Sequence, residues 1–250
     1  AELGIPPPGD IRRCLIALAE DSDLARVFQH RFTQGTFAGH PIGNLMIAAL
    51  VEQTGDFAEA VAAAGRMLGT RGHVFPSTNE LVRLSAIVEG GVVTGQAAVA
   101  GTDKRIRSVH LRPPTPAAYK EAVYAILGAD QVILGPGSLF TSIVATLLVP
   151  GVAQALRDTD ARRVFVCNSR QQPGETEGLD AVAHVEGLLA HAGRDSIDVA
   201  VVHSPVLPGD GVALSPGPWR FPHIKLIEAD VAHPDGGHDP ERLAAVLKDV

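Results

Sequence analysis

Apolar residues recur at helical spacing through the first part of the chain, to about residue 69. Pro41 opens one predicted helix, at a position where a missing amide proton costs nothing. Two more helices are predicted, one starting at Asp10, whose carboxylate can cap the free amides of the first turn, and one from Asp56 to Leu68. The apolar face of the helix after Pro41 falls at i, i+3, i+4, i+7 and i+8, and consists of Ile42, Leu45, Met46, Ala49 and Leu50.

The second segment, residues 72–113, has the pattern of β-structure. Two runs, residues 81–88 and 92–99, flank Glu89-Gly90-Gly91, which is typical of a hairpin connection. Residues 105–111 are predicted to form a third strand. We interpret this segment as a small antiparallel insertion beside the main sheet.

The third segment alternates short apolar strands with helical patterns. Strands are predicted at residues 131–134, 164–167 and 199–202, and a last helix is predicted from about Pro240. Strands that are apolar on both faces and separated by helices indicate a parallel sheet covered on both sides. Residues 205–222 are rich in Gly and Pro and are predicted to be a surface loop. The chain is therefore predicted to be one α/β domain over residues 1–250.

Composition and charge narrow the classes of function. Hydrophobic residues make up 46% of the chain, enough for a core without a disulfide or metal. The net charge of −7 argues against nucleic acid or an anionic membrane as the main partner, and the aromatic content of 4% argues against stacking on single-stranded bases. Phosphate ligands are not excluded, because local backbone amides hold them.

The two cysteines are too far apart in the sequence to indicate a disulfide framework or a four-ligand zinc site. No run of 18 apolar residues predicts a membrane span, and the first residues do not have the pattern of a signal peptide. We therefore expect a cytoplasmic protein in a reducing compartment.

The segment Gly135-Pro136-Gly137-Ser138 joins a predicted strand to a predicted helix. Its two glycines allow backbone amides to approach a ligand closely, and the following helix adds partial positive charge. Thr141 and Ser142 add hydroxyls around the same turn. An anion site and an ordinary strand-to-helix turn explain these residues equally well. The segment lacks the Lys of a Walker loop and a complete G-x-G-x-x-G, so neither ATP hydrolysis nor a standard dinucleotide fingerprint is supported.

Other polar side chains follow strands or precede helices, where they can bind a ligand or simply cap a turn. Amides suit a nucleobase or sugar hydroxyls, since they both donate and accept hydrogen bonds. Asp10 is the one residue considered as a metal ligand, and the histidines show no spacing typical of a metal site. The candidate pocket residues are Asp10, Arg12, His40, Asn44, Ser77, Thr78, Asn79, Asn168 and Gln172.

In this order the motifs resemble the YvcK branch of the YvcK/CofD-like family, which includes bacterial gluconeogenesis factors. The likeness extends to about residue 193. It is carried by five segments: Leu3 to Arg12, Ala38 to Asn44, Pro76 to Asn79, Leu134 to Ser142, and Gln172 to Thr176.

The resemblance implies a Rossmann-like fold and a nucleotide-type ligand, with a UDP-sugar expected and NAD or GDP left open. It makes the loop of residues 135–138 a phosphate binder and Asp10, Asn44 and Asn168 pocket residues. The YvcK branch is associated with cell shape and cell-wall synthesis, so cell-wall or signalling proteins are expected partners. Self-association into a homo-oligomer is left open.

The resemblance also implies a Gly-rich strand-turn-helix ahead of the first motif. On the order of 50 residues, including the family's first strand, are thus expected to be missing from this chain, since a βαβ unit takes 30 or more.

Two functions follow from the resemblance. One is a regulatory protein that binds a nucleotide-sugar and has no catalytic residue. The alternative is a phospholactyl transferase of the CofD kind, which uses a guanylylated donor and magnesium. Transfer on a diphosphate requires carboxylates that hold the metal, and only Asp10, Glu80 and Glu175 occur in the candidate loops. We therefore favour the regulator.

Overall fold

The structure is a computed structural model that describes residues 4–250. Two compact units are present, one of residues 4–82 and 117–122 and the other of residues 83–116 and 123–250. Helix α6 (Lys120–Leu127) contains one of the boundaries. The single domain over residues 1–250 stays a prediction, and Leu3, where the first family motif begins, lies outside the described residues.

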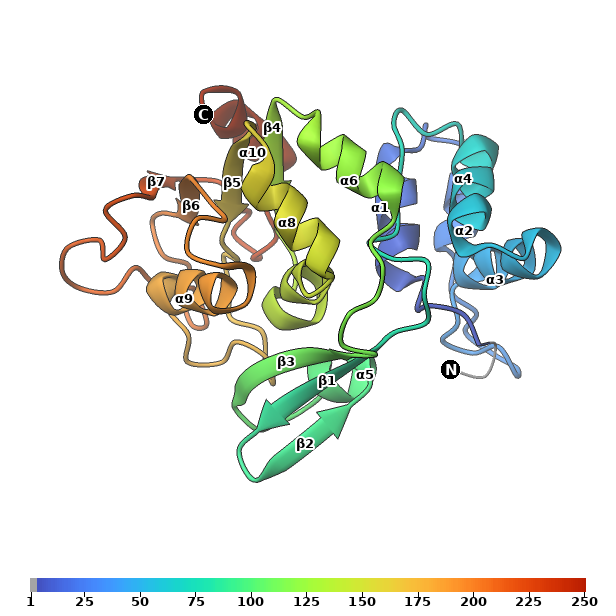
Figure 1. Ribbon diagram of the computed structural model, residues 1–250, viewed down its shortest axis with the longest axis horizontal. Coiled ribbons are helices and arrows are strands. Elements are labelled where there is room, and N and C mark those ends of the chain that lie inside the picture. The colour runs from blue at the N-terminus through green and yellow to red at the C-terminus, as the bar shows by residue number, and fades with distance from the viewer. Residues whose placement is uncertain (1–3) are drawn as a thin grey trace. The chain divides into compact units, whose positions relative to one another are not determined.

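The first unit is helical, as the spacing of apolar residues predicts. Its described residues form α1 (Gly9–Leu18), α2 (Asp23–Gln29), α3 (Ile42–Thr54) and α4 (Phe57–Leu68), drawn in blue to cyan in Figure 1. Each contributes side chains to a shared apolar core, which drives their packing because burial removes apolar surface from water. The large side chains buried in it include Leu15, Phe28, Ile47 and Val61.

The start of α4 follows the predicted signal, but the start of α1 does not. Gly55 ends α3 with a positive φ of 73°, and the Asp56 carboxylate caps α4 by accepting from the Glu59 amide at 2.8 Å. The prediction that Asp10 caps α1 is wrong. The helix begins at Gly9, so Asp10 lies inside the first turn and pairs with Arg13 at 3.4 Å.

An antiparallel sheet in the second unit corresponds to the predicted insertion. Its strands β1 (Arg83–Val88), β2 (Gly91–Thr94) and β3 (Ile106–Arg112) are arranged in the order β2-β1-β3. The hairpin turns at Glu89-Gly90, where Gly90 has a φ of 84°. This sheet and its hairpin confirm the prediction.

The predicted strand over residues 92–99 is correct only to Thr94. Gly95 turns the chain with a φ of 107°, and α5 (Gln96–Ala100) follows. The sequence Gln-Ala-Ala-Val-Ala after this glycine has strong helix formers and only one β-branched residue, which explains the change from strand to helix.

The second sheet of this unit is parallel, with the order β4-β5-β6-β7. Its strands are β4 (Gln131–Leu134), β5 (Arg162–Val166), β6 (Val199–His203) and β7 (Lys225–Ala229). In register, Ile133 pairs with Val164, Phe165 with Ala200 and Val201 with Ile227. The three predicted strands are thus neighbours in one sheet, as expected.

Helices cover this sheet on both faces. Val164, Val166 and Val201 pack with Leu243 of α10 (Pro240–Lys248) in one core cluster. Side chains alternate along a strand, so Phe165 points to the opposite face, and it is buried there. The remaining helical elements of the unit are η1 (Leu139–Val144), α7 (Ala145–Leu147), α8 (Pro150–Asp158) and α9 (Ala181–Ala192).

Some elements were not predicted, among them β7 and α2. The strand β7 contains two charged residues, Lys225 and Glu228, and follows the Gly- and Pro-rich loop, and α2 is only 7 residues long. Within residues 4–250 no single helix could cross a membrane, and only the bent pair of residues 139–147 and 150–158, with a 77° break, meets the criteria of length and composition.

Candidate functional site

The loop of residues 135–138 leaves the carboxyl end of β4, where ligands of open parallel sheets bind. Gly135 is required by the fold, since its φ is +88° and an added Cβ would lie 3.0 Å from the Val166 carbonyl oxygen. Gly137 is different, because its φ is not positive and an added Cβ would meet only Ile143 at 3.8 Å. Packing therefore does not explain the glycine at 137.

The side chains of Ser138, Gln172 and Asn168 form a hydrogen-bonded group that we call the amide cluster. Gln172 Nε2 donates to Ser138 Oγ at 3.1 Å, and Asn168 Nδ2 donates to Gln172 Oε1 at 3.3 Å. All three are partly buried and uncharged. They follow β4 and β5, which are adjacent strands, so the sheet brings their carboxyl ends together.

The main chain around Gln172 is held in a tight turn. The amides of Glu175 and Thr176 both donate to the Gln172 carbonyl, at 3.0 and 2.9 Å, and the Gln172 amide donates to Thr176 Oγ1 at 2.8 Å. Gly174 lies in this turn with a φ of +75°, and an added Cβ would approach the Thr102 carbonyl oxygen to 2.2 Å. The backbone of the turn is thus fixed, while the Gln172 side chain contacts only other side chains.

A buried carboxylate already occupies part of the predicted anion site. Glu175, 7% exposed, accepts at Oε1 from the amides of Phe140 and Thr141 at 2.6 and 2.8 Å. The Thr141 hydroxyl donates to Glu175 Oε2 at 3.0 Å. The sequence placed Thr141 in a phosphate site, but in this structure its polar groups bind the protein's own acid. From the sequence, Glu175 was only one of three acids in the candidate loops, and its burial could not be read from the motif.

The cysteine ahead of Asn168 does not act as a nucleophile at neutral pH. Burial raises the pKa of Cys167 to about 12, so its sulfur stays protonated. Its carbonyl accepts from His238 Nε2 at 3.2 Å, and burial lowers the pKa of His238. A neutral imidazole therefore holds the end of β5 next to the amide cluster. His238, beyond β7, was not predicted as a site residue.

The candidate residues of the first unit lie in separate groups. Arg12, 7% exposed, donates from Nε to Asn44 Oδ1 at 3.1 Å. Burial and the neighbouring cations Arg31 and Arg13 lower the pKa of Arg12. His40 is exposed at the loop before α3.

Ser77, Thr78 and Asn79 lie near the start of α4. Asn79 Oδ1 accepts from the Ala58 amide at 2.9 Å, and Thr78 Oγ1 accepts from the Glu80 amide at 3.2 Å. The Ser77 carbonyl accepts from the Tyr119 amide at 3.0 Å. These contacts hold turns and a helix end, which is the alternative that the sequence left open.

Comparison with known proteins places the chain among described families. The family model of "2-phospho-L-lactate transferase CofD" matches residues 1–214. A "Gluconeogenesis factor" of Bacillus subtilis is 42% identical over 212 residues, covering 84% of this chain and 67% of its own length. A Mycobacterium tuberculosis relative is 40% identical over 265 residues, covering 100% of this chain and 78% of its own. The chain belongs to the CofD/YvcK family.

A "Gluconeogenesis factor" of Halalkalibacterium halodurans is 40% identical over 205 residues, and the match spans 81% of this chain and 64% of that protein. The crystal structure of a UPF0052 family member from Bacillus halodurans has a TM-score of 0.92 and 33% identity, covering 99% of this chain and 84% of that one. The family resemblance and the fold class are thereby confirmed.

Magnesium, which the transferase of this family would need, does not fit the side chains around the loop. The described residues contain no group of three His, Cys, Asp or Glu that could hold a metal ion. Both oxygens of Glu175 already accept hydrogen bonds, and Asp10 pairs with Arg13. A magnesium ion prefers several carboxylate or water oxygens in octahedral geometry, which these donors do not provide.

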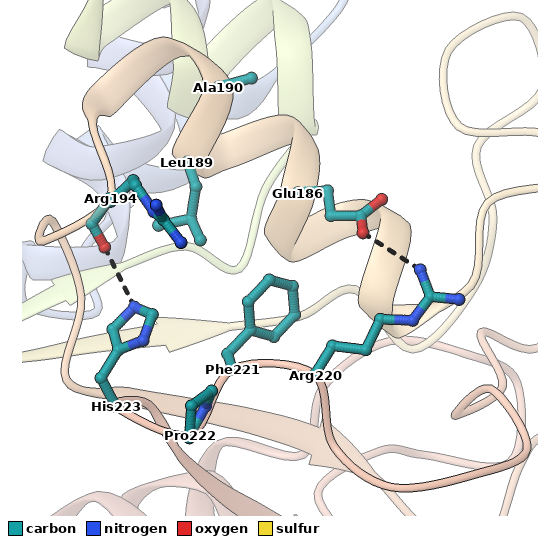
Figure 2. Close-up of a pocket in the computed structure, with 8 residues that line it drawn as sticks. All are labelled: Glu186, Leu189, Ala190, Arg194, Arg220, Phe221, Pro222 and His223. Atoms are coloured by element: carbon teal, nitrogen blue, oxygen red, sulfur yellow. Dashed lines mark hydrogen bonds and ion pairs between the residues drawn. The ribbon is translucent and has the colours of Figure 1, made fainter.

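A groove of about 520 Å³ lies elsewhere on the second unit, between α9 and the loop ahead of β7 (Figure 2). The Phe221 ring faces the helix there, Arg220 pairs with Glu186 at 3.3 Å, and His223 donates to the Arg194 carbonyl at 3.3 Å. None of the candidate site residues lines it. Its lining consists of Glu186, Leu189, Ala190, Arg194, Arg220, Phe221, Pro222 and His223.

Proposed function

We propose that this chain is a regulatory protein that binds a nucleotide-sugar, of the UDP-sugar type, at the carboxyl edge of its parallel sheet. The observation that carries the proposal is the amide cluster. Its three side chains hydrogen-bond to one another across two adjacent strand ends. Amide and hydroxyl groups both donate and accept, so they can exchange these bonds for bonds to a base or a sugar.

Backbone amides beside the cluster support binding of the diphosphate. The amides of Gly137, Ser138 and Leu139 have no hydrogen-bond acceptor among residues 4–250. A phosphate oxygen is a strong acceptor for such groups. Gly137 has no Cβ although the fold has room for one, which favours close approach of a ligand to these amides.

The transferase alternative is less well supported. The matched family model has a transferase name. The acids around the loop are too few to hold magnesium, and both oxygens of Glu175 already accept hydrogen bonds. Cys167 is protonated at neutral pH and supplies no thiolate. The geometry thus supports binding without group transfer.

The cellular role belongs to the same proposal. Relatives named "Gluconeogenesis factor" support a link to growth on gluconeogenic carbon sources. We extend this to control of cell shape and cell-wall synthesis in the cytoplasm through protein partners, as the resemblance implies. Depletion of the protein should alter cell shape during such growth, and normal cell shape would contradict this part.

The binding proposal is tested by measuring the unfolding temperature with UDP-glucose, UDP, NAD and GDP. A ligand at 100 times its Kd adds about 2.7 kcal/mol to stability. Ser138→Ala should weaken UDP-glucose binding by about 1 kcal/mol, the usual worth of one hydrogen bond, and Gly137→Val should weaken it more. No stabilisation by any of the nucleotides would reject the proposal. Release of a nucleoside monophosphate from an activated phospholactate donor would favour the transferase.

A further inference from the structure

The Glu175 carboxylate lies in the same turn as Gln172 of the amide cluster. Both of its oxygens accept hydrogen bonds, as an ionised carboxylate does. The amides of Glu175 and Thr176 donate to the Gln172 carbonyl at 3.0 and 2.9 Å, and these hydrogen bonds hold Glu175 next to the amide cluster. An ionised Glu175 therefore places a negative charge beside the candidate ligand site.

Positive side chains in this loop do not offset that charge. Arg170 pairs with Asp210 and donates to the Pro208 carbonyl at 3.1 Å, so its own charge is already engaged. The amide cluster itself is neutral. Glu175 accepts from the amides of Phe140 and Thr141, which directly follow residues 137–139 in the chain. A ligand phosphate bound to the amides of residues 137–139 would therefore lie beside the Glu175 carboxylate.

Phosphates differ in charge according to how they are esterified. A terminal phosphate carries a charge between about −1.5 and −2 at pH 7, because its second ionisation has a pKa near 6. A phosphate esterified on both sides carries one charge and has no second proton to lose. The penalty from a nearby fixed anion rises with the charge on the ligand.

We infer that Glu175 determines specificity, selecting diphosphates substituted at both ends, such as nucleotide-sugars and dinucleotides, over nucleotides that end in a free phosphate. This inference rests on the proposed function. Glu175 excludes the more highly charged terminal phosphate by repulsion, while the bonds from Phe140 and Thr141 hold the carboxylate in place.

The test is a comparison of Kd values for UDP-glucose and UDP, measured by calorimetry on the wild type, Glu175→Gln and Glu177→Gln. Glutamine at 175 keeps the size and removes the charge. Its oxygen can still accept from the two amides, and its nitrogen can donate to Thr141 Oγ1, since a hydroxyl also accepts. We expect the ratio of the Kd for UDP to the Kd for UDP-glucose to be about tenfold lower in Glu175→Gln than in the wild type, which corresponds to 1.4 kcal/mol. Glu177 is exposed, so Glu177→Gln should keep the wild-type preference.

Lowering the pH from 7.5 to 5.0 gives a second measurement that needs no variant. UDP gains a proton near pH 6, so wild-type affinity for UDP should rise relative to UDP-glucose, and Glu175→Gln should show a smaller rise. An unchanged wild-type ratio at both pH values would overturn the inference, as would a folded Glu175→Gln protein with the wild-type preference. Failure of both nucleotides to bind would instead reject the proposed function.

Discussion

Asn79 in the first unit and Gln172 in the second are both amide side chains that the sequence placed in a ligand pocket, and the structure uses them differently. Asn79 binds the main chain of α4, accepting from the Ala58 amide at 2.9 Å, and donates to the Asp56 cap. Gln172 binds the side chains of Ser138 and Asn168. An amide that satisfies a helix end stabilises the fold, whereas an amide bonded to other side chains can change partners without cost to the backbone.

Among the substitutions considered, one in the turn that holds Gln172 should have the largest effect on the free energy of unfolding. Gly174→Ala introduces a Cβ at a φ of +75° and 2.2 Å from the Thr102 carbonyl oxygen. A left-handed alanine costs about 1 kcal/mol, and the overlap adds about 2 kcal/mol more. We expect a loss of about 3 kcal/mol in the free energy of unfolding, measured by urea denaturation.

Gly178→Ala is the matched control, because Gly178 has the same φ of +75° and nothing within 4 Å of an added Cβ. Only the conformational cost of about 1 kcal/mol should remain. Equal losses for the two variants would show that the contact with Thr102 does not constrain the turn.

The stabilising role of Asn79 predicts a smaller effect. Asn79→Ala leaves the Ala58 amide without its acceptor at the start of α4, and loss of a cap costs about 1 kcal/mol, with 2 as the upper end. Ser77→Ala is the control, because Ser77 accepts from the Tyr119 amide through its carbonyl, which the substitution keeps. If Asn79→Ala lowered UDP-glucose affinity and left the free energy of unfolding unchanged, the contrast with Gln172 would be broken.

The two ends of the parallel sheet should also differ in their dependence on pH. At the amino ends of β5 and β6, Arg163 donates to Asp198 from its backbone amide and from Nε, both at 2.9 Å. Burial raises the pKa of Asp198, but the hydrogen bonds from Arg163 outweigh it and the pKa is lowered. Because the folded pKa lies below the unfolded value of about 3.9, this stability is present above pH 4 and is lost as pH falls through the folded pKa.

We expect the Arg163–Asp198 contact to contribute about 1 kcal/mol at neutral pH. The free energy of unfolding, measured from pH 6 to pH 3, should fall less steeply in Asp198→Asn than in the wild type. Parallel curves would show that another acid causes the loss. The neutral amide cluster at the opposite end has no such dependence.

The fold could be predicted largely from the sequence, because long apolar patterns set element type. The apolar runs of β5 and β6 are buried as predicted. The helix after Pro41 is also present, but its predicted apolar face is wrong: the buried residues are Gly43, Ile47 and Ala48, and Ala49 is exposed. The pattern was insufficient where conformation depends on one residue or on tertiary contacts. Gly95 converts the end of a predicted strand into α5, and β7 is recognised only by its pairing with β6.

The site was less predictable, because sequence motifs show which residues are close in the chain and not how each side chain is satisfied. Ser138, Asn168 and Gln172 do meet, since adjacent parallel strands bring their loops together. The occupation of the Phe140 and Thr141 amides by Glu175 was not foreseeable, because it joins residues 34 and 35 positions apart through a buried contact.

The smallest expected effect on stability, and the sharpest test of the comparison, is Gln172→Ala. The side chain bonds only to Ser138 and Asn168, both partly buried and able to bind water instead, so the free energy of unfolding should fall by no more than about 0.5 kcal/mol. The backbone turn remains, because its bonds use the Gln172 carbonyl and amide. Affinity for UDP-glucose should nevertheless fall about tenfold, since a hydrogen-bonding ligand loses a partner that alanine cannot replace. Calorimetry and urea denaturation on the same preparation separate the two quantities. A large loss of stability with unchanged affinity would place Gln172 with Asn79, as a residue that stabilises the fold.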